Sequence, residues 1–183
     1  PPRLLLVGRD AEEEAARLFG TRSGVLEEGP GSLWHTLHLR GRLQFAIVRP
    51  EGTSGGAALR EATPDLILFF ASASAGADDQ RFLNNLREEE QRLHGQRAPF
   101  FIVADAENRL PWEGAHAVLP ASVRGRVLEA VARALPDEAR LEFARVTGEK
   151  AVQREIALSL TRSATAVATA IGAQPIPLAD LPV

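Results

Sequence analysis

The stretch RLLLVGRDAEEEAARLFG, at residues 3–20, constrains the fold of this chain more than any other part of the sequence. Four consecutive apolar residues at positions 4–7 predict a buried strand, and Gly8 after them predicts a tight turn. The apolar spacing from there to Phe19 predicts an amphipathic helix. A buried strand that leads directly into a helix is typical of an open α/β sheet, in which ligands bind beyond the carboxyl ends of the strands. We therefore expect the candidate site at this turn.

The residues that follow the turn are acidic. Asp10 is followed by Glu12, Glu13 and Glu14, and four carboxylates so close together would repel a triphosphate. A phosphate-binding P-loop needs G-x-x-x-x-G-K-[ST], because its glycines, lysine and hydroxyl hold the phosphates and magnesium, and this pattern is absent. The acids have a structural interpretation instead. Asp10 as N-cap with Glu13 three residues later predicts a capping-box-like start, where negative charge is favourable.

Composition and charge limit the class of protein. The chain has 183 residues, of which 45% are hydrophobic, so we expect one domain of ordinary size with an appendage. The formal net charge is -3 and no block of basic residues is present, which excludes a nucleic-acid binder that relies on a basic surface. The absence of cysteine excludes disulfides and cysteine metal sites and fits a reducing compartment. With no signal segment and no run of 18 apolar residues, we expect a cytoplasmic protein.

The middle of the chain alternates between strands and helices. Apolar runs at residues 33–39 and 43–48, joined tightly at Arg40-Gly41, predict two antiparallel strands, and residues 21–32 read as a loop. The remaining elements expected are helices at 57–62, 78–93 and 123–135 and strands at 66–72, 99–104 and 116–119. This order predicts an α/β fold in three layers, with a mostly parallel sheet, one antiparallel hairpin and helices on both faces.

A helical extension is expected after Pro136, which marks the end of the first domain. Its apolar face is formed by residues at helical spacing, namely Leu141, Phe143, Val146, Val152, Ile156 and Leu160. We therefore divide the chain into a domain at residues 1–136 and an extension at 137–183. The small apolar residues at 164–173 are too few to span a bilayer.

The order of elements resembles the Ras-like GTPase domain of the bacterial Era-like type. The resemblance is carried by VG at the first strand, RPEG after the hairpin, DLILFFAS in the fourth strand, FIVADAEN in the fifth and VLPAS in the sixth. It implies a Ras-like sheet with a nucleotide pocket at its carboxyl edge. The remnants of that pocket are then the residues at the family's motif positions, namely Gly8, Arg9, Asp10, Arg49, Gly52, Asp105, Glu107, Ala121 and Ser122.

This sequence departs from the family at each motif. Aligned with the family, the first turn is about three residues too short, and the lysine and serine positions fall on Ala11 and Glu12. Arg49 stands where the magnesium-supporting aspartate is expected, although Gly52 survives. The guanine-reading N-K-x-D motif is replaced by residues 104–107, ADAE, of which only Glu107 keeps a carboxylate at the last position.

These departures predict a degenerate GTPase-like domain. Phosphate, magnesium and base contacts each contribute to affinity, and phosphoryl transfer depends on placed charge and metal. We therefore expect no catalytic residue, no bound metal and no cofactor, and a role as an interaction or regulatory module for an unknown protein partner. The alternative is a divergent but active GTP-binding hydrolase that uses GTP or GDP with magnesium.

The end of the chain resembles the start of an uncharacterised C-terminal module that is fused to Era-like GTPases in many bacteria. Residues 175–180, PIPLAD, are the diagnostic piece. In that family the module continues into helices that are thought to associate with membrane. The resemblance implies membrane association through parts beyond Val183, at the inner face of the cell membrane.

Three further patterns in the sequence bear on function. Residues 64–70 and 114–135 resemble parts of a response-regulator receiver domain, but its phosphate-accepting aspartate and its lysine would fall on Phe70 or Ala71 and on Ala121. Arg9 and Arg49 are both expected at the carboxyl edge, where they either bind an anion together or pair with Asp10 and the nearby glutamates. His35 and His38 are three apart on a strand, so they point to opposite faces and do not share a metal.

Overall fold

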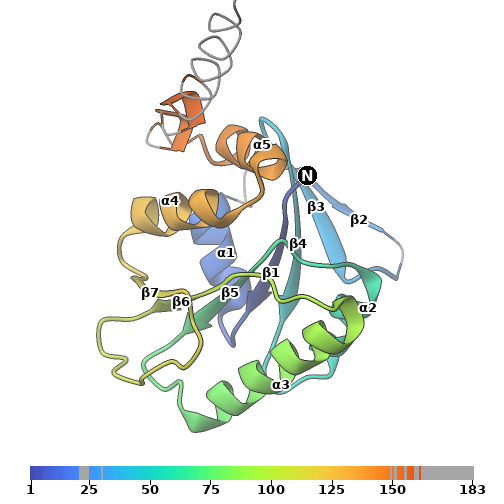
Figure 1. Cartoon of the computed structure of the whole chain (residues 1–183), viewed down its shortest axis with the longest axis vertical. Helices are drawn as coiled ribbons and strands as arrows, with labels where there is room; N and C mark the ends of the chain where they lie inside the picture. The colour runs from blue at the N-terminus through green and yellow to red at the C-terminus, as the bar shows by residue number, and fades with distance from the viewer. Residues whose placement is uncertain are drawn as a thin grey trace, which may run out of the picture.

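The chain folds around one sheet, as seen in a computed structural model that describes residues 1–20, 25–29, 31–148, 150, 152–154, 156–158 and 161. Within these residues the sheet has seven strands in the order β2-β3-β4-β1-β5-β6-β7 (Figure 1). The strands are β1 (Arg3–Val7), β2 (Val25–Glu28), β3 (Trp34–His38), β4 (Arg42–Val48), β5 (Leu66–Ala71), β6 (Phe100–Ala104) and β7 (Ala117–Pro120). Neighbouring strands from β4 to β7 are parallel, whereas β3 is antiparallel to both β4 and β2.

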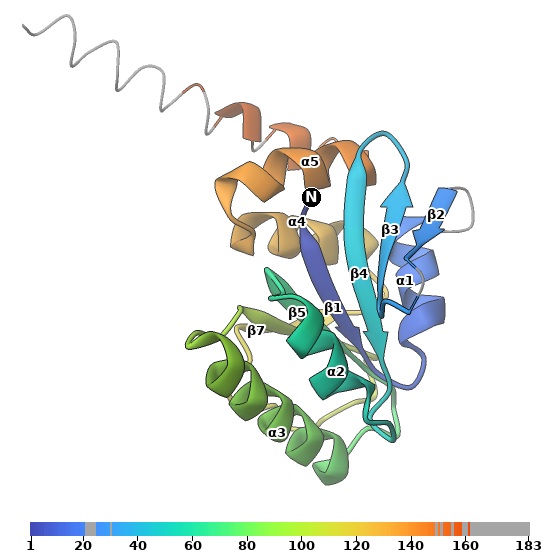
Figure 2. The ribbon, with the colours of Figure 1, turned by 90° about the vertical axis from the view of Figure 1, so that its right-hand side faces the viewer.

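Helices cover both faces of the sheet and make three layers. They are α1 (Ala11–Phe19), α2 (Ser54–Glu61), α3 (Ala77–His94), α4 (Arg124–Ala134) and α5 (Asp137–Thr147). Figures 1 and 2 show α2 and α3 on one side of the sheet and α1 and α4 on the other. The predicted fold class, an α/β fold with a mostly parallel sheet and an antiparallel hairpin, is confirmed.

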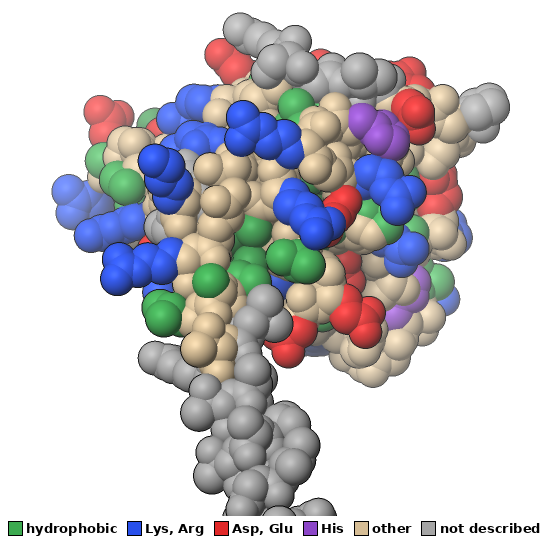
Figure 3. Space-filling model, turned by 90° about the horizontal axis from the view of Figure 1, so that it is seen from above, with side chains coloured by type: hydrophobic (Ala, Val, Ile, Leu, Met, Phe, Trp, Pro, Cys, Tyr) green, Lys and Arg blue, Asp and Glu red, His purple; other side chains and the backbone are tan. Residues whose placement is uncertain are grey.

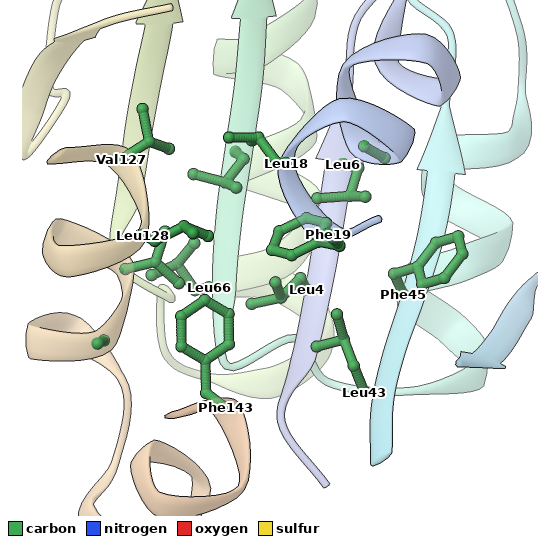
Figure 4. Packing of buried hydrophobic residues seen from close by; sticks show 14 of the residues in the cluster. Leu4, Leu6, Leu18, Phe19, Leu43, Phe45, Leu66, Val127, Leu128 and Phe143 are labelled. Carbon is green, nitrogen blue, oxygen red and sulfur yellow. The ribbon is translucent and has the colours of Figure 1, made fainter. Parts of the chain in front are cut away.

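The central strand β1 joins the two cores. Its residues Leu4, Leu5, Leu6 and Val7 have no exposed surface. Because side chains alternate along a strand, Leu4 and Leu6 enter the core under α1 and α4, while Leu5 and Val7 enter the core under α2 and α3. Figure 4 shows Leu4 and Leu6 packed among side chains from α1, α4 and α5. Full burial on both faces explains the uninterrupted apolar run.

Two local predictions were wrong. Residues 21–32 were expected to be a loop, yet β2 pairs with β3 there, with Glu28 opposite His35. This edge strand is only four residues long and carries two glutamates. It therefore lacks the apolar run from which a strand is usually predicted. Helix α2 begins at Ser54, three residues before the expected start, and Gly55 lies buried within it.

The first part of the expected C-terminal extension packs into the core. Phe143 of α5 is fully buried, and its ring meets that of Phe19 edge to face, with centroids 6.2 Å apart. Val152 and Ile156 belong to the same cluster. Leu160 and residues 175–180 lie outside the described residues. Across the part that is described, no helix combines the length and apolar character required to cross a membrane.

A buried carboxyl group fixes the turn after α3. Glu90 has no exposed surface, and its Oε1 accepts a 2.6 Å hydrogen bond from the backbone N–H of Ala98. Burial raises the pKa of Glu90, against the opposing effects of that hydrogen bond and of the positive charges of Arg87, His94 and Arg97. In the folded state Glu90 therefore keeps its proton to a higher pH than it does in the unfolded chain.

Replacing Phe143 by alanine should lower the free energy of unfolding by about 3–5 kcal/mol, because it leaves a cavity in the core. The matched control is Leu141→Ala in the same helix, where the side chain is 43% exposed and a much smaller loss is expected. Urea unfolding of both variants measures the difference. Equal losses would contradict the placement of α5 in the core.

The stability of the wild-type chain should fall relative to Glu90→Gln as the pH rises above about 4.5. The folded-state pKa of Glu90 is raised, so its contribution is present below the unfolded-state pKa and is lost as the pH rises through the folded-state value. Urea unfolding between pH 4.5 and pH 8 tests this, with the exposed Glu88→Gln as control. A constant difference between the wild type and Glu90→Gln over that range would refute it.

Candidate functional site

The turn between β1 and α1 contains only Gly8, Arg9 and Asp10. Gly8 has φ 147°, and its N–H donates a 3.0 Å hydrogen bond to the carbonyl oxygen of Val48. A Cβ at Gly8 would lie 2.8 Å from the carbonyl oxygen of Phe70, which is closer than real contacts of this kind. Only glycine fits here, because this φ and this close approach both exclude a side chain. The tight turn predicted at Gly8 is confirmed, and the structure shows that Gly8 lies between the ends of β4 and β5.

The start of α1 differs from the predicted capping box. Asp10 is the N-cap residue, and its carbonyl oxygen accepts the Glu14 N–H at 3.0 Å, but its side chain caps nothing. Its backbone lies at φ -103° and ψ 19°, outside the extended region that most capping side chains use. Glu12 and Glu13 are exposed in the first turn of the helix, and Glu14 pairs with Arg17. The acids therefore favour the helix through its dipole.

The two arginines at the carboxyl edge each have an acidic partner. The Arg49 Nη2 lies 3.7 Å from Glu12 Oε2, which confirms the predicted pairing with the acids of the turn. The Arg9 Nε lies 3.0 Å from Glu51 Oε1, a partner that the sequence did not suggest. All four side chains are more than half exposed, so these pairs add little stability. Even so, each of the two guanidinium groups has a carboxylate beside it.

A small hollow lies at the carboxyl ends of β1, β5 and β6, where an open α/β sheet binds ligands. Its volume is about 30 Å³. It is lined by Asp10, Glu14, Phe70, Ala71, Ser72, Val103, Asp105 and Ala121. The structure thus brings together Asp10, Asp105 and Ala121 of the predicted site, whereas Gly52, Glu107 and Ser122 do not line the hollow. Arg17 Nη2 donates a 2.9 Å hydrogen bond to the Ala121 carbonyl oxygen and ties α1 to the end of β7.

Asn108 organises the loops beside this hollow, a role that no motif in the sequence predicts. Its Nδ2 donates to the carbonyl oxygens of Ser72 at 2.9 Å and Ala75 at 3.3 Å. Its Oδ1 accepts from the Leu110 N–H and from the Trp112 Nε1–H, both at 3.2 Å. One amide therefore joins the loop after β5 to the loop after β6. The sequence signal was weak, since an asparagine in a loop is common.

A larger groove of about 840 Å³ lies between α1 and strands β3 and β4. It is lined by Arg9, Asp10, Glu12, Glu13, Ala15, Ala16, Glu28, His35, Phe45, Ile47 and Arg49. The rings of His35 and Phe45 lie side by side with centroids 5.7 Å apart. His35 Nδ1 is 3.6 Å from Glu28 Oε1, whereas His38 Nε2 is 3.0 Å from Glu27 Oε2. Nothing in the sequence predicted this groove, because β2 was not expected.

Neither concavity offers a metal site. Among the described residues, no three His, Asp or Glu side chains are grouped so that they could hold a metal ion. The groove carries four carboxylates, from Asp10, Glu12, Glu13 and Glu28, against two guanidinium groups. This charge opposes the binding of an anion and favours a cation.

Replacing Asn108 by alanine should lower the free energy of unfolding by about 1–3 kcal/mol, because two loops lose their shared hydrogen-bond partner. Asn108→Asp should also destabilise, since a carboxylate oxygen would replace the donor that faces two carbonyl oxygens. Urea unfolding measures both, with the exposed Asn85→Ala on α3 as control. If Asn108→Ala unfolded like Asn85→Ala, the network would have no structural role.

Comparisons with known proteins do not assign the chain to a family. No model of a protein family matches it, and no curated protein sequence matches it significantly.

Proposed function

We propose that this chain is a degenerate Ras-like GTPase domain that binds no nucleotide and serves as a non-catalytic interaction or regulatory module. The role requires no cofactor and no catalytic residue. The module would act on a protein partner near the inner face of a membrane. The resemblance of residues 175–180, PIPLAD, to a membrane-associated module supports this placement.

The sheet supports this ancestry over a receiver domain. The antiparallel hairpin of β3 and β4 lies on one side of β1, and the parallel strands β5, β6 and β7 lie on the other. A receiver-like plan places a helix between successive strands of a parallel sheet instead. The hairpin is the feature that the resemblance to Era-like GTPases required.

The observation that carries the proposal is the turn at Gly8. A P-loop wraps phosphates with successive backbone N–H groups. The turn has only three residues, and the first of them, Gly8, is held against Val48 and Phe70, so no length is left for such a loop. The hollow beside it has about 30 Å³, whereas small-molecule pockets usually have about 300–1,000 Å³. Asp10 and Asp105 add negative charge to the hollow, which would repel phosphates.

Titration of the chain with GTP or GDP and magnesium should give no heat and no rise in melting temperature at millimolar nucleotide. A ligand that binds the folded state raises its stability by mass action, so the two measurements check one another. A GTPase with an intact P-loop serves as positive control. Micromolar binding would overturn the proposal and favour the divergent GTP-binding hydrolase.

A further inference from the structure

We propose that the groove between α1 and strands β3 and β4 binds a segment of a protein partner in which an apolar side chain is flanked by lysine or arginine residues. The inference rests on the proposed function as an interaction module, and it names the surface and the chemistry of the partner. The proposed ligand of the groove is a protein segment and not a nucleotide.

The shape of the groove suits a side chain with an apolar body. Phe45 and Ile47 of β4 and Ala16 of α1 supply apolar surface at its base, and Ile47 and Ala16 remain partly exposed. The volume of about 840 Å³ is large enough for several side chains. Burial of an apolar side chain there would be favourable in proportion to the area removed from water.

The negative charge on the two walls of the groove favours basic residues on either side of the partner's apolar side chain. One wall is the first turn of α1, with Glu12 and Glu13, and the other carries Glu28 at the end of β2. An extended or helical segment lying between the walls would therefore meet carboxylates on both sides. Lysine and arginine are the side chains that such walls attract, and their aliphatic stems also cover apolar surface.

The described part of the chain leaves some of these acids without a cation. Arg49 lies beside Glu12 and Arg9 beside Glu51, so both groove arginines already have partners. Asp10 and Glu13 form no ion pair within the described residues. In the described ranges Glu28 pairs with His35 alone, whose Nδ1 lies 3.6 Å from Glu28 Oε1, beyond hydrogen-bond distance. A basic partner would supply the missing charge.

A second copy of the chain is the competing occupant. Figure 3 shows a group of basic side chains, beside several acidic ones, on the face seen from above, which is the end of the molecule where α5 lies. The groove is at the start of α1, which follows the carboxyl end of β1. A basic face on one copy could meet an acidic groove on another in a head-to-tail contact. Such a heterologous contact forms rings or open filaments, and the association increases with concentration.

The test starts from a display library of random 12-residue peptides selected on the whole 183-residue chain. Enriched peptides are synthesised and titrated by fluorescence anisotropy into the wild type and into a groove variant with Glu13→Lys and Glu28→Lys. The matched control carries Glu88→Lys and Glu113→Lys, two exposed acids outside the groove with the same change in charge. Thermal melting confirms that both variants fold.

The proposal expects enriched peptides with two or more basic residues around a large apolar residue. Their binding should weaken at least tenfold in the groove variant, remain unchanged in the control, and weaken as salt is raised. Absence of such a motif, or equal binding to the groove variant, would overturn it. Concentration-dependent association of the chain that the groove variant abolishes would assign the groove to a second copy and also overturn it.

The two proposals fail separately. Binding of nucleotide in the calorimetric titration would reject the proposed function without affecting the peptide result. If no basic peptide is enriched, or if the peptides bind the groove variant equally well, the groove is rejected as the docking site. The absence of nucleotide binding would still support the proposed function.

Discussion

The structure depends on the burial of β1 on both of its faces and on the way in which it ends. The strand contributes alternate side chains to the two cores and is hydrogen bonded to β4 and β5, so every layer of the fold contacts it. Its end is held at Gly8, because that residue lies against the carbonyl oxygens of Val48 and Phe70. Helix α1 starts at Ala11, only three residues after Gly8. The geometry of the carboxyl edge follows from this one constraint.

That constraint also separates two kinds of surface. The edge where an open α/β sheet usually holds a ligand is reduced to a hollow of about 30 Å³. Space opens instead to one side of α1, above β3 and β4, where the groove has about 840 Å³. The carboxylates at the start of α1 favour the helix and line this groove as well. In our proposal a surface for protein segments takes the place of a nucleotide pocket.

Much of the fold could be predicted, because its elements have strong local patterns. The apolar run before Gly8 and the paired strands around Arg40-Gly41 predicted β1, β3 and β4 in nearly their observed places. Strand β2 was missed because two of its four residues are glutamate and only its pairing with β3 makes it a strand. Three of the nine predicted site residues, Asp10, Asp105 and Ala121, line the hollow. Asn108 was missed because its role lies in hydrogen bonds to residues as distant as Ser72.

The sequence by itself determined the periods of the elements, the acidity of the first turn and the loss of a phosphate-binding motif. Each of these depends on residues that are close together in the chain. Only the tertiary structure decided that Arg9 pairs with Glu51, that Phe143 enters the core beside Phe19, and that Glu28 faces α1 across a groove. These contacts join residues far apart in sequence, and their geometry depends on the packing of the whole sheet. Patterns of neighbouring residues in the sequence therefore do not predict these contacts.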